Sequence, residues 1–112
     1  METQKFLNTQ LKIIKVLRKL DSDMGVQTFH AFCAIASEEG IGITELAGRL
    51  DMSLAGASRN VQYLSKIRKA GVKGLGLVVS TYDQHERRRK IITLTDKGKD
   101  LVEQLMGYGV KP

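Results

Sequence analysis

Two β-branched runs, LVVSTY at 77–82 and RKIITL at 89–94, flank the polar turn DQHERR in a chain whose remaining apolar pattern is helical. Such runs favour strands, and a short polar turn between them predicts an antiparallel hairpin. The expected fold class is therefore mainly α with a small β-hairpin (α+β). The predicted order is helix, helix, strand fragment, helix, helix, hairpin, helix.

The first two predicted helices differ in how their apolar residues are distributed. Residues 5–20 carry a wide apolar face, more than one neighbouring helix would cover. The second helix, from Val26 to its end at Gly40, is apolar almost all round between Phe29 and Ala36 and is expected at the centre of the core. Cys33 lies in this helix, where a free cysteine usually behaves as a small buried hydrophobe.

Two short helices are expected after a strand fragment at 41–43. Thr44 is placed to cap the first, and Ser53, after the turn at Asp51, is placed to cap the second, which we expect to run to about Lys69. The core-facing side of this second helix is predicted to consist of Leu54, Ala57, Val61, Leu64 and Ile67.

The glycine-rich stretch AGVKGLG at 70–76 is expected to be a flexible link to the hairpin, since it lacks the strand and helix that a phosphate-binding loop needs. Thr95 then caps a last helix that ends at Gly107 and Gly109. Its apolar stripe is Leu101, Val102, Leu105 and Met106.

The chain has 112 residues, 42% of them hydrophobic, and a single proline, which is typical of one folded domain. We divide it into an N-terminal helix (1–23), a core (24–94) and a C-terminal helix with a tail (95–112). The sequence shows neither a long uncharged apolar span nor a signal-peptide pattern, so the expected location is the cytoplasm, in association with the nucleoid.

The net charge of +6 is concentrated in one segment. Residues 1–50 contain six basic and six acidic side chains, whereas residues 51–99 contain eleven basic and four acidic ones. A domain with a localised positive region has the electrostatic character of a polyanion-binding protein.

The two short helices predict a helix-turn-helix, with the second helix entering the major groove of DNA. Small residues on its outer side would allow close approach, while Arg59 and Gln62 could bond guanine or adenine edges. A glycine at position 56 costs roughly 1 kcal/mol relative to alanine, so close approach to DNA or to another helix is a plausible reason for it. The candidate DNA-binding residues of this helix are Ser53, Ala55, Gly56, Ser58, Arg59, Gln62, Tyr63 and Lys66.

Three consecutive arginines at the hairpin end, Arg87, Arg88 and Arg89, would repel one another without an anionic neighbour. A hairpin beside a major-groove helix is a wing, and its arginines suit the electronegative minor groove. Strand alternation would place Arg87 and Arg89 on one side and Arg88 on the other, with Asp83 and Glu86 available to pair with them. Further predicted phosphate contacts are Lys66, Lys69, Lys90 and Lys97.

Residues 40–66 (GIGITELAGRLDMSLAGASRNVQYLSK) and 86–101 (ERRRKIITLTDKGKDL) resemble the helix-turn-helix and wing of the MarR family of transcription regulators, in a short variant. The resemblance implies a homodimer formed by the terminal helices, with Arg88 in the minor groove and Glu86 at the position of a family aspartate. It also implies that Leu94, Thr95 and Gly98 join the wing to the last helix. Many such regulators bind small phenolic ligands or sense oxidants, and a small-molecule effector is left open here.

The resulting hypothesis is a sequence-specific regulator of transcription, acting as a repressor on double-stranded DNA. One alternative is a non-regulatory DNA-binding accessory or architectural protein, and another is a protein-interaction adapter. No catalytic constellation is visible, and one cysteine with two histidines is too few for a metal site, so we expect neither an enzyme, nor a metal, nor another cofactor.

Overall fold

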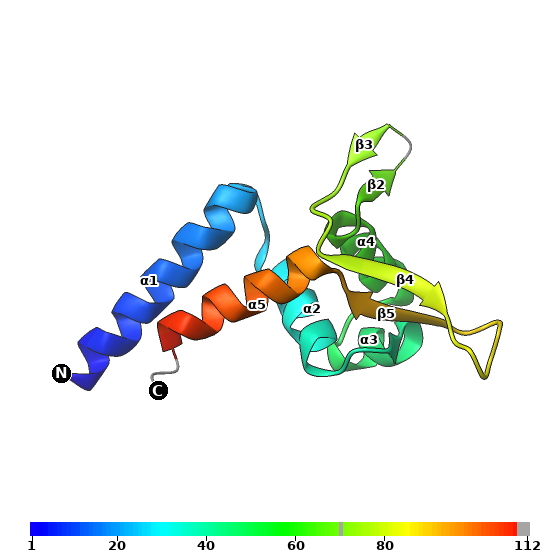
Figure 1. Ribbon diagram of the computed structural model, residues 1–112, viewed down its shortest axis with the longest axis horizontal. Coiled ribbons are helices and arrows are strands. Elements are labelled where there is room, and N and C mark those ends of the chain that lie inside the picture. Colours follow the sequence, from blue (N-terminus) through cyan, green and yellow to red (C-terminus); the bar gives the residue numbers. More distant parts are fainter. Residues whose placement is uncertain (70, 110–112) are drawn as a thin grey trace.

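The computed structural model describes residues 1–69 and 71–109, excluding the side chains of residues 67–69 and 109. A winged helix forms one end of an elongated molecule measuring 50 × 31 × 27 Å, and α1 and α5 form the other (Figure 1). In chain order the elements are α1 (Glu2–Leu20), α2 (Val26–Ser37), β1 (Ile41–Gly42), α3 (Ile43–Arg49), α4 (Leu54–Leu64), β2 (Ile67–Lys69), β3 (Val72–Lys73), β4 (Val78–Tyr82), β5 (Lys90–Leu94) and α5 (Asp96–Gly109).

The wing is the β4–β5 hairpin, and β5 also pairs with β1 on its other side. All pairings are antiparallel, running from Val78 opposite Leu94 to Tyr82 opposite Lys90, with Ile41 opposite Ile92. The predicted hairpin and strand fragment are therefore confirmed. Pairing with β1 fixes the root of the wing against the segment that leads directly into α3.

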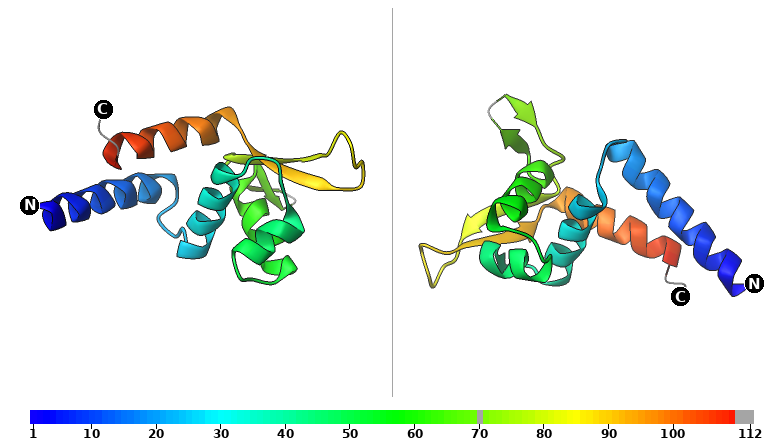
Figure 2. Two further views of the ribbon diagram at one scale, coloured as in Figure 1. Left: turned by 90° about the horizontal axis from the view of Figure 1, so that it is seen from below. Right: turned by 180° about the vertical axis from the view of Figure 1, so that it is seen from behind.

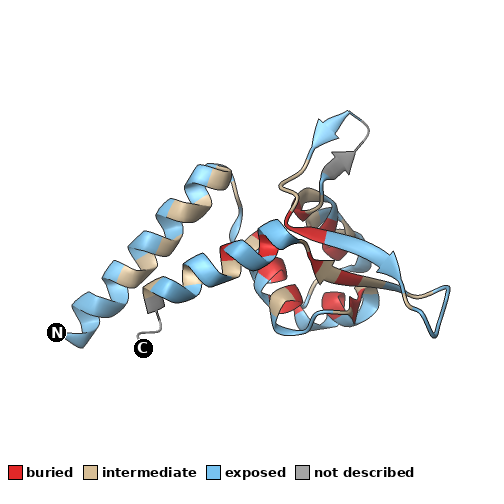
Figure 3. Ribbon diagram, viewed as in Figure 1, coloured by how far each residue is buried: buried red, intermediate tan, exposed pale blue. Residues whose placement is uncertain are grey.

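The core lies between α2, α3, α4 and the inner face of the sheet (Figure 3). Ile35, Leu46, Leu64 and Ile92 are almost wholly buried there. Burying an aliphatic side chain of this size stabilises a fold by roughly 1.5–3 kcal/mol, so these contacts hold the helix-turn-helix to the sheet.

The first helix has no buried residue. Its last turns reach the core through Val16 and Leu20, and Thr9 Oγ1 donates to the Tyr108 carbonyl of α5 at 3.1 Å. Phe6, Leu7, Leu11 and Ile14 remain 48–62% exposed, so the wide apolar face predicted for this helix is uncovered within the chain. Figure 2 shows α1 and the end of α5 running side by side away from the winged helix.

The prediction that one helix runs from Ser53 to about Lys69 is wrong. The helix ends at Leu64 because Ser65 is extended (ψ 174°) and its hydroxyl donates to the Val61 carbonyl at 2.7 Å. The flexible link predicted at 70–76 is also wrong, because β2 and β3 form a second, smaller hairpin there. The side chains of Ile67 and Lys69, predicted respectively to face the core and to contact phosphate, lie outside the described residues.

Two further expectations fail locally. Thr44 does not cap α3; the helix begins at Ile43, two residues before the start that a Thr44 cap implies. The residue before it is Gly42, whose N–H donates to the Glu45 carboxylate at 3.1 Å. Cys33 is exposed, because α2 turns Ala31, Phe32, Ala34 and Ile35 inward and leaves Cys33 on the outer side. Partial burial of the sulfur raises the pKa of this thiol, which favours its neutral form.

The last helix agrees with its predicted start, and its end at Gly109 agrees with one of the two glycines predicted to end it. The Thr95 hydroxyl accepts the Gly98 N–H at 3.1 Å, as expected of a cap. Gly107 does not interrupt the helix, which continues to Gly109. No helix in the described part of the chain has both the length and the apolarity that a membrane span requires.

Candidate nucleic-acid interface

The start of α4 is fixed by a side-chain cap. The Ser53 hydroxyl accepts the Gly56 N–H at 3.0 Å, which confirms the predicted cap. The preceding turn places Asp51 in the left-handed region at φ 52°, and Met52 N–H donates to the Ala47 carbonyl at 3.1 Å. These contacts set the position of α4 relative to α3.

The two sides of α4 are clearly distinguished by burial. Ala57, Val61 and Leu64 face the core, whereas Leu54, predicted to join them, is 53% exposed because it lies in the first turn, beyond the edge of the core. Of the residues predicted to face DNA, Ser53, Ala55, Arg59, Gln62 and Lys66 are exposed, and Gly56, Ser58 and Tyr63 are half-buried.

The glycine at position 56 lies against the helix cap. A Cβ added there would lie 3.2 Å from the Ser53 hydroxyl, so a side chain would crowd the cap. One turn later, Asn60 Nδ2 donates to the Gly56 carbonyl at 3.0 Å, and Asn60 Oδ1 accepts the Thr28 hydroxyl at 2.8 Å. Asn60 thus joins α4 to α2, a role that no local sequence pattern indicates.

The Tyr63 side chain, which we predicted to contact DNA, does not have the outward orientation that such a contact requires. Its hydroxyl oxygen is buried, and its backbone carbonyl accepts the Leu75 N–H at 3.0 Å. The side chain therefore directs its polar end into the protein. Arg59 and Gln62 remain the exposed long polar residues of the helix.

A tight turn carries the first two wing arginines. Arg89 N–H donates to the Glu86 carbonyl at 2.9 Å, which places Arg87 and Arg88 at the two central positions, and both are exposed. The turn replaces the strand alternation that we expected at these residues. Glu86 contributes its carbonyl here, and no ion pair within the described part of the chain includes its carboxylate.

Arg89 differs from its two neighbours. Its guanidinium pairs with Asp83 of the wing at 3.2 Å and with Glu45 of α3 at 2.5 Å. The Gly42 N–H, followed by Arg89, lowers the pKa of the Glu45 carboxyl. The His85 N–H and Arg89 likewise lower the pKa of Asp83. Arg89 thereby connects the wing to the start of the helix-turn-helix.

The outer side of α4 and the wing share a small hollow of about 150 Å³. Ser58 and Gln62 line it from α4, and Ser80 and Lys90 line it from the two wing strands. On the same face of the hairpin, Lys90 Nζ lies 5.9 Å from the centre of the Tyr82 ring, and this exposed tyrosine was not among the predicted residues. The structure therefore brings together the predicted residues Ser58, Gln62 and Lys90.

Lys97, expected to bind phosphate, makes a contact within the protein. Its ammonium donates to the Leu75 carbonyl at 2.8 Å while the side chain stays exposed. Lys66, just beyond the end of α4, is also exposed. The predicted basic residues thus extend from the wing to the far end of α4.

No family model and no curated protein matches this sequence. Solved structures do match in three dimensions. A MepR–DNA complex from S. aureus has a TM-score of 0.68 at 18% identity, over 96% of this chain and 82% of that one. A MarR transcriptional regulator from Methanosarcina mazei Go1 has a TM-score of 0.66 at 23% identity, over 95% and 69% of the respective chains.

A shorter part of a third structure matches, the PcaV transcriptional regulator from Streptomyces coelicolor in complex with its natural ligand. Its TM-score is 0.61 at 19% identity, over 77% of this chain, which spans only 55% of the PcaV chain. The MepR and Methanosarcina mazei matches each cover at least 95% of this chain, and the PcaV match covers 77% of it. The chain therefore has the winged helix-turn-helix fold of the MarR transcriptional regulators.

Proposed function

We propose that this protein is a sequence-specific regulator of transcription that represses genes by binding double-stranded DNA. The observation that carries the proposal is the hollow shared by α4 and the wing, in which Ser58 and Gln62 lie beside Lys90. A duplex docked on α4 would meet the wing at the same time, with Arg87 and Arg88 exposed at its end.

In this proposal α4 occupies the major groove. Arg59 and Gln62 are the exposed side chains long enough to hydrogen-bond base edges, and the small residues Ala55 and Ser58 permit close approach. Arg87 and Arg88 enter the adjacent minor groove, while Lys66 and Lys90 contact phosphates. The structural likeness to a MepR–DNA complex supports this arrangement.

We further propose that the functional unit is a homodimer. The face of α1 formed by Phe6, Leu7, Leu11 and Ile14 is uncovered in the chain, and on α5 Met106 is 54% exposed. Apolar surface of this extent on a terminal helix is characteristic of an association site. A second copy packed there would give a two-fold protein that reads a palindromic site.

The first experiment is selection of bound sequences from a random duplex pool. A two-fold motif with half-sites about one helical turn apart would support specific, dimeric reading. Retained binding without any motif would favour an architectural DNA-binding protein. Weak binding that is insensitive to salt would favour an interaction adapter, because phosphate contacts make affinity fall steeply with salt.

The wing supplies a direct test by mutation. Replacing Arg88 with alanine is expected to weaken binding to the selected duplex by about 1 kcal/mol or more, because an arginine in the minor groove is lost. Arg18→Ala, which removes an equal charge from α1, is the matched control. Fluorescence anisotropy titrations measure both, and unchanged affinity of the Arg88 variant would remove the wing from the mechanism.

A further inference from the structure

The hairpin formed by β2 and β3 is not needed to connect α4 to the wing. Leu77 N–H donates to the Leu64 carbonyl at 2.7 Å, so the chain returns beside the end of α4 before β4 begins. Residues 65–69 and 71–76 therefore belong to a projection that leaves the fold and returns to it at the end of α4. A short turn would be enough to connect α4 to β4, yet the chain forms the β2–β3 hairpin between them.

This projection is braced at its base. Gly74 N–H donates to the Lys66 carbonyl at 2.9 Å, and Gly76 N–H donates to the Ser65 carbonyl at 3.1 Å. The Thr95 hydroxyl and the Lys97 ammonium add bonds to the carbonyls of Gly76 and Leu75, at 2.6 and 2.8 Å. The base therefore holds the hairpin in a defined direction from α4.

The charged residues of this region are all basic. The sequence contains no aspartate or glutamate between Asp51 and Asp83, whereas residues 66–73 alone contain Lys66, Arg68, Lys69 and Lys73. Lys66 and Lys73 are exposed. In every ion pair among the described residues the basic partner is an arginine, so neither lysine is paired with a carboxylate there. Such positive charge concentrated on a small projection favours a polyanionic neighbour.

The position of the hairpin relative to α4 also favours a contact with DNA. Seen from behind, β2 and β3 continue past the C-terminal end of α4, while the wing extends to one side of it (Figure 2). A hollow of about 660 Å³ opens at the hairpin, bordered by Lys66, Lys73 and Lys97. If α4 lies in the major groove, a phosphate backbone of the duplex would run past the C-terminal end of the helix.

We infer that the β2–β3 hairpin is a second phosphate-binding element, which binds the DNA backbone at the C-terminal end of α4, away from the contact made by the wing. This inference rests on the proposed function. The side chains that carry it among the described residues are Lys66 and Lys73, with Lys97 bracing the hairpin base. Its contribution is independent of base sequence, because it is made to phosphates.

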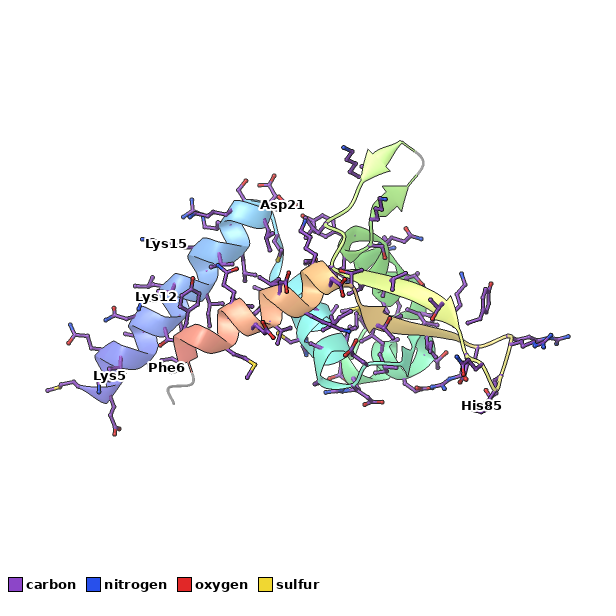
Figure 4. All side chains as sticks on the ribbon, viewed as in Figure 1. Lys5, Phe6, Lys12, Lys15, Asp21 and His85 are labelled. Atoms are coloured by element: carbon purple, nitrogen blue, oxygen red, sulfur yellow. The ribbon has the colours of Figure 1, made fainter. Side chains whose placement is uncertain are left out.

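The test is the salt dependence of DNA binding by the full chain carrying Lys66→Gln and Lys73→Gln. Each lost phosphate contact makes the slope of log affinity against log salt less steep by about 0.9, so the double variant should lose about 1.8 for each bound chain, or about 3.6 for a bound homodimer. The matched control is Lys5→Gln with Lys12→Gln, which removes the same charge from α1 at the far end of the molecule (Figure 4).

A second double variant, Arg87→Gln with Arg88→Gln, distinguishes this inference from the proposed function. If the wing variant and the hairpin variant both lower the slope while the α1 control does not, both elements bind the backbone. A hairpin variant with the slope of the control, alongside a weakened wing variant, overturns the inference about the hairpin and the phosphate contact of Lys66, and leaves the proposed role of the wing and of α4. A wild-type chain whose DNA binding is weak and insensitive to salt overturns both.

Discussion

Three consecutive arginines in this chain have different environments. Arg87 and Arg88 occupy the centre of an exposed turn, whereas Arg89 is held by Asp83 and Glu45. The sequence could predict a basic turn, and it could pair Asp83 with a nearby arginine. It could not assign Glu45 as a partner, because that contact depends on how the wing folds back over α3.

The ion pair between Arg89 and Glu45 leads to a prediction about DNA binding by variants of these two residues. If Arg89 positions the wing, Arg89→Gln and Glu45→Gln should both weaken DNA binding severalfold, since each breaks the same link. A purely electrostatic effect would instead make Glu45→Gln bind more tightly, because the variant removes a negative charge. Affinity titrations at constant salt separate the two, and tighter binding by Glu45→Gln would show that the charge of Glu45, and not its link to Arg89, governs DNA binding.

Acid should break this link in a definite direction. The folded-state pKa of both Glu45 and Asp83 is lowered, so their contribution to stability is complete above the ordinary carboxyl pKa of about 4 and is lost as the pH falls through the lowered values. The melting temperature of the wild type should therefore fall more steeply than that of Glu45→Gln below about pH 4. Parallel melting curves from about pH 6 to 3 would contradict this assignment.

At the scale of elements, periodicity and cap residues predicted the starts of α2, α4 and α5 and the wing. The expected end of α2 at Gly40 is wrong, because the helix ends at Ser37. The β2–β3 hairpin was missed because its glycines suggest a flexible link. What stabilises it is a set of backbone bonds to residues 63–66, which a local pattern cannot reveal. The length of α4 was overestimated for the same reason, since the extended backbone that ends it also begins this hairpin.

The hairpin base provides a matched pair of glycine substitutions. A Cβ at Gly74 would lie too close to the Ser65 carbonyl, whereas a Cβ at Gly48 in α3 would meet no atom within 4 Å. Gly74→Ala is expected to lower the free energy of unfolding by about 1–3 kcal/mol, and Gly48→Ala to raise it by about 0.5–1. Urea denaturation measures both, and equal effects would show that the hairpin base can relax.

At the scale of the whole molecule, buried residues are distributed unevenly between the winged helix and the terminal helices. Nearly all fully buried residues lie in the winged helix, and none lies in α1 (Figure 3). The sequence predicted the excess apolar surface of α1 but not its orientation, because Val16 and Leu20 pack on the core and Thr9 bonds α5, contacts between segments far apart in the sequence.

The dimer proposal gives a measurement at this scale. Leu7→Gln with Leu11→Gln should leave the winged helix folded, because both leucines are more than half exposed, and should convert a dimer at micromolar concentration into a monomer. Lys5→Gln with Lys12→Gln on the same helix should remain dimeric. Sedimentation equilibrium distinguishes these outcomes, and a monomeric wild type would exclude the proposed assembly.

The absence of buried residues in α1 has a thermodynamic consequence. A helix that buries little in its own chain has only modest intrinsic stability, since most helical stability in proteins comes from tertiary packing. If a second copy supplies the missing contacts, ordering of the N-terminal segment becomes linked to protein concentration. Dilution would then loosen the helix before the monomer unfolds, so its amide exchange rate would report how far the subunits have associated.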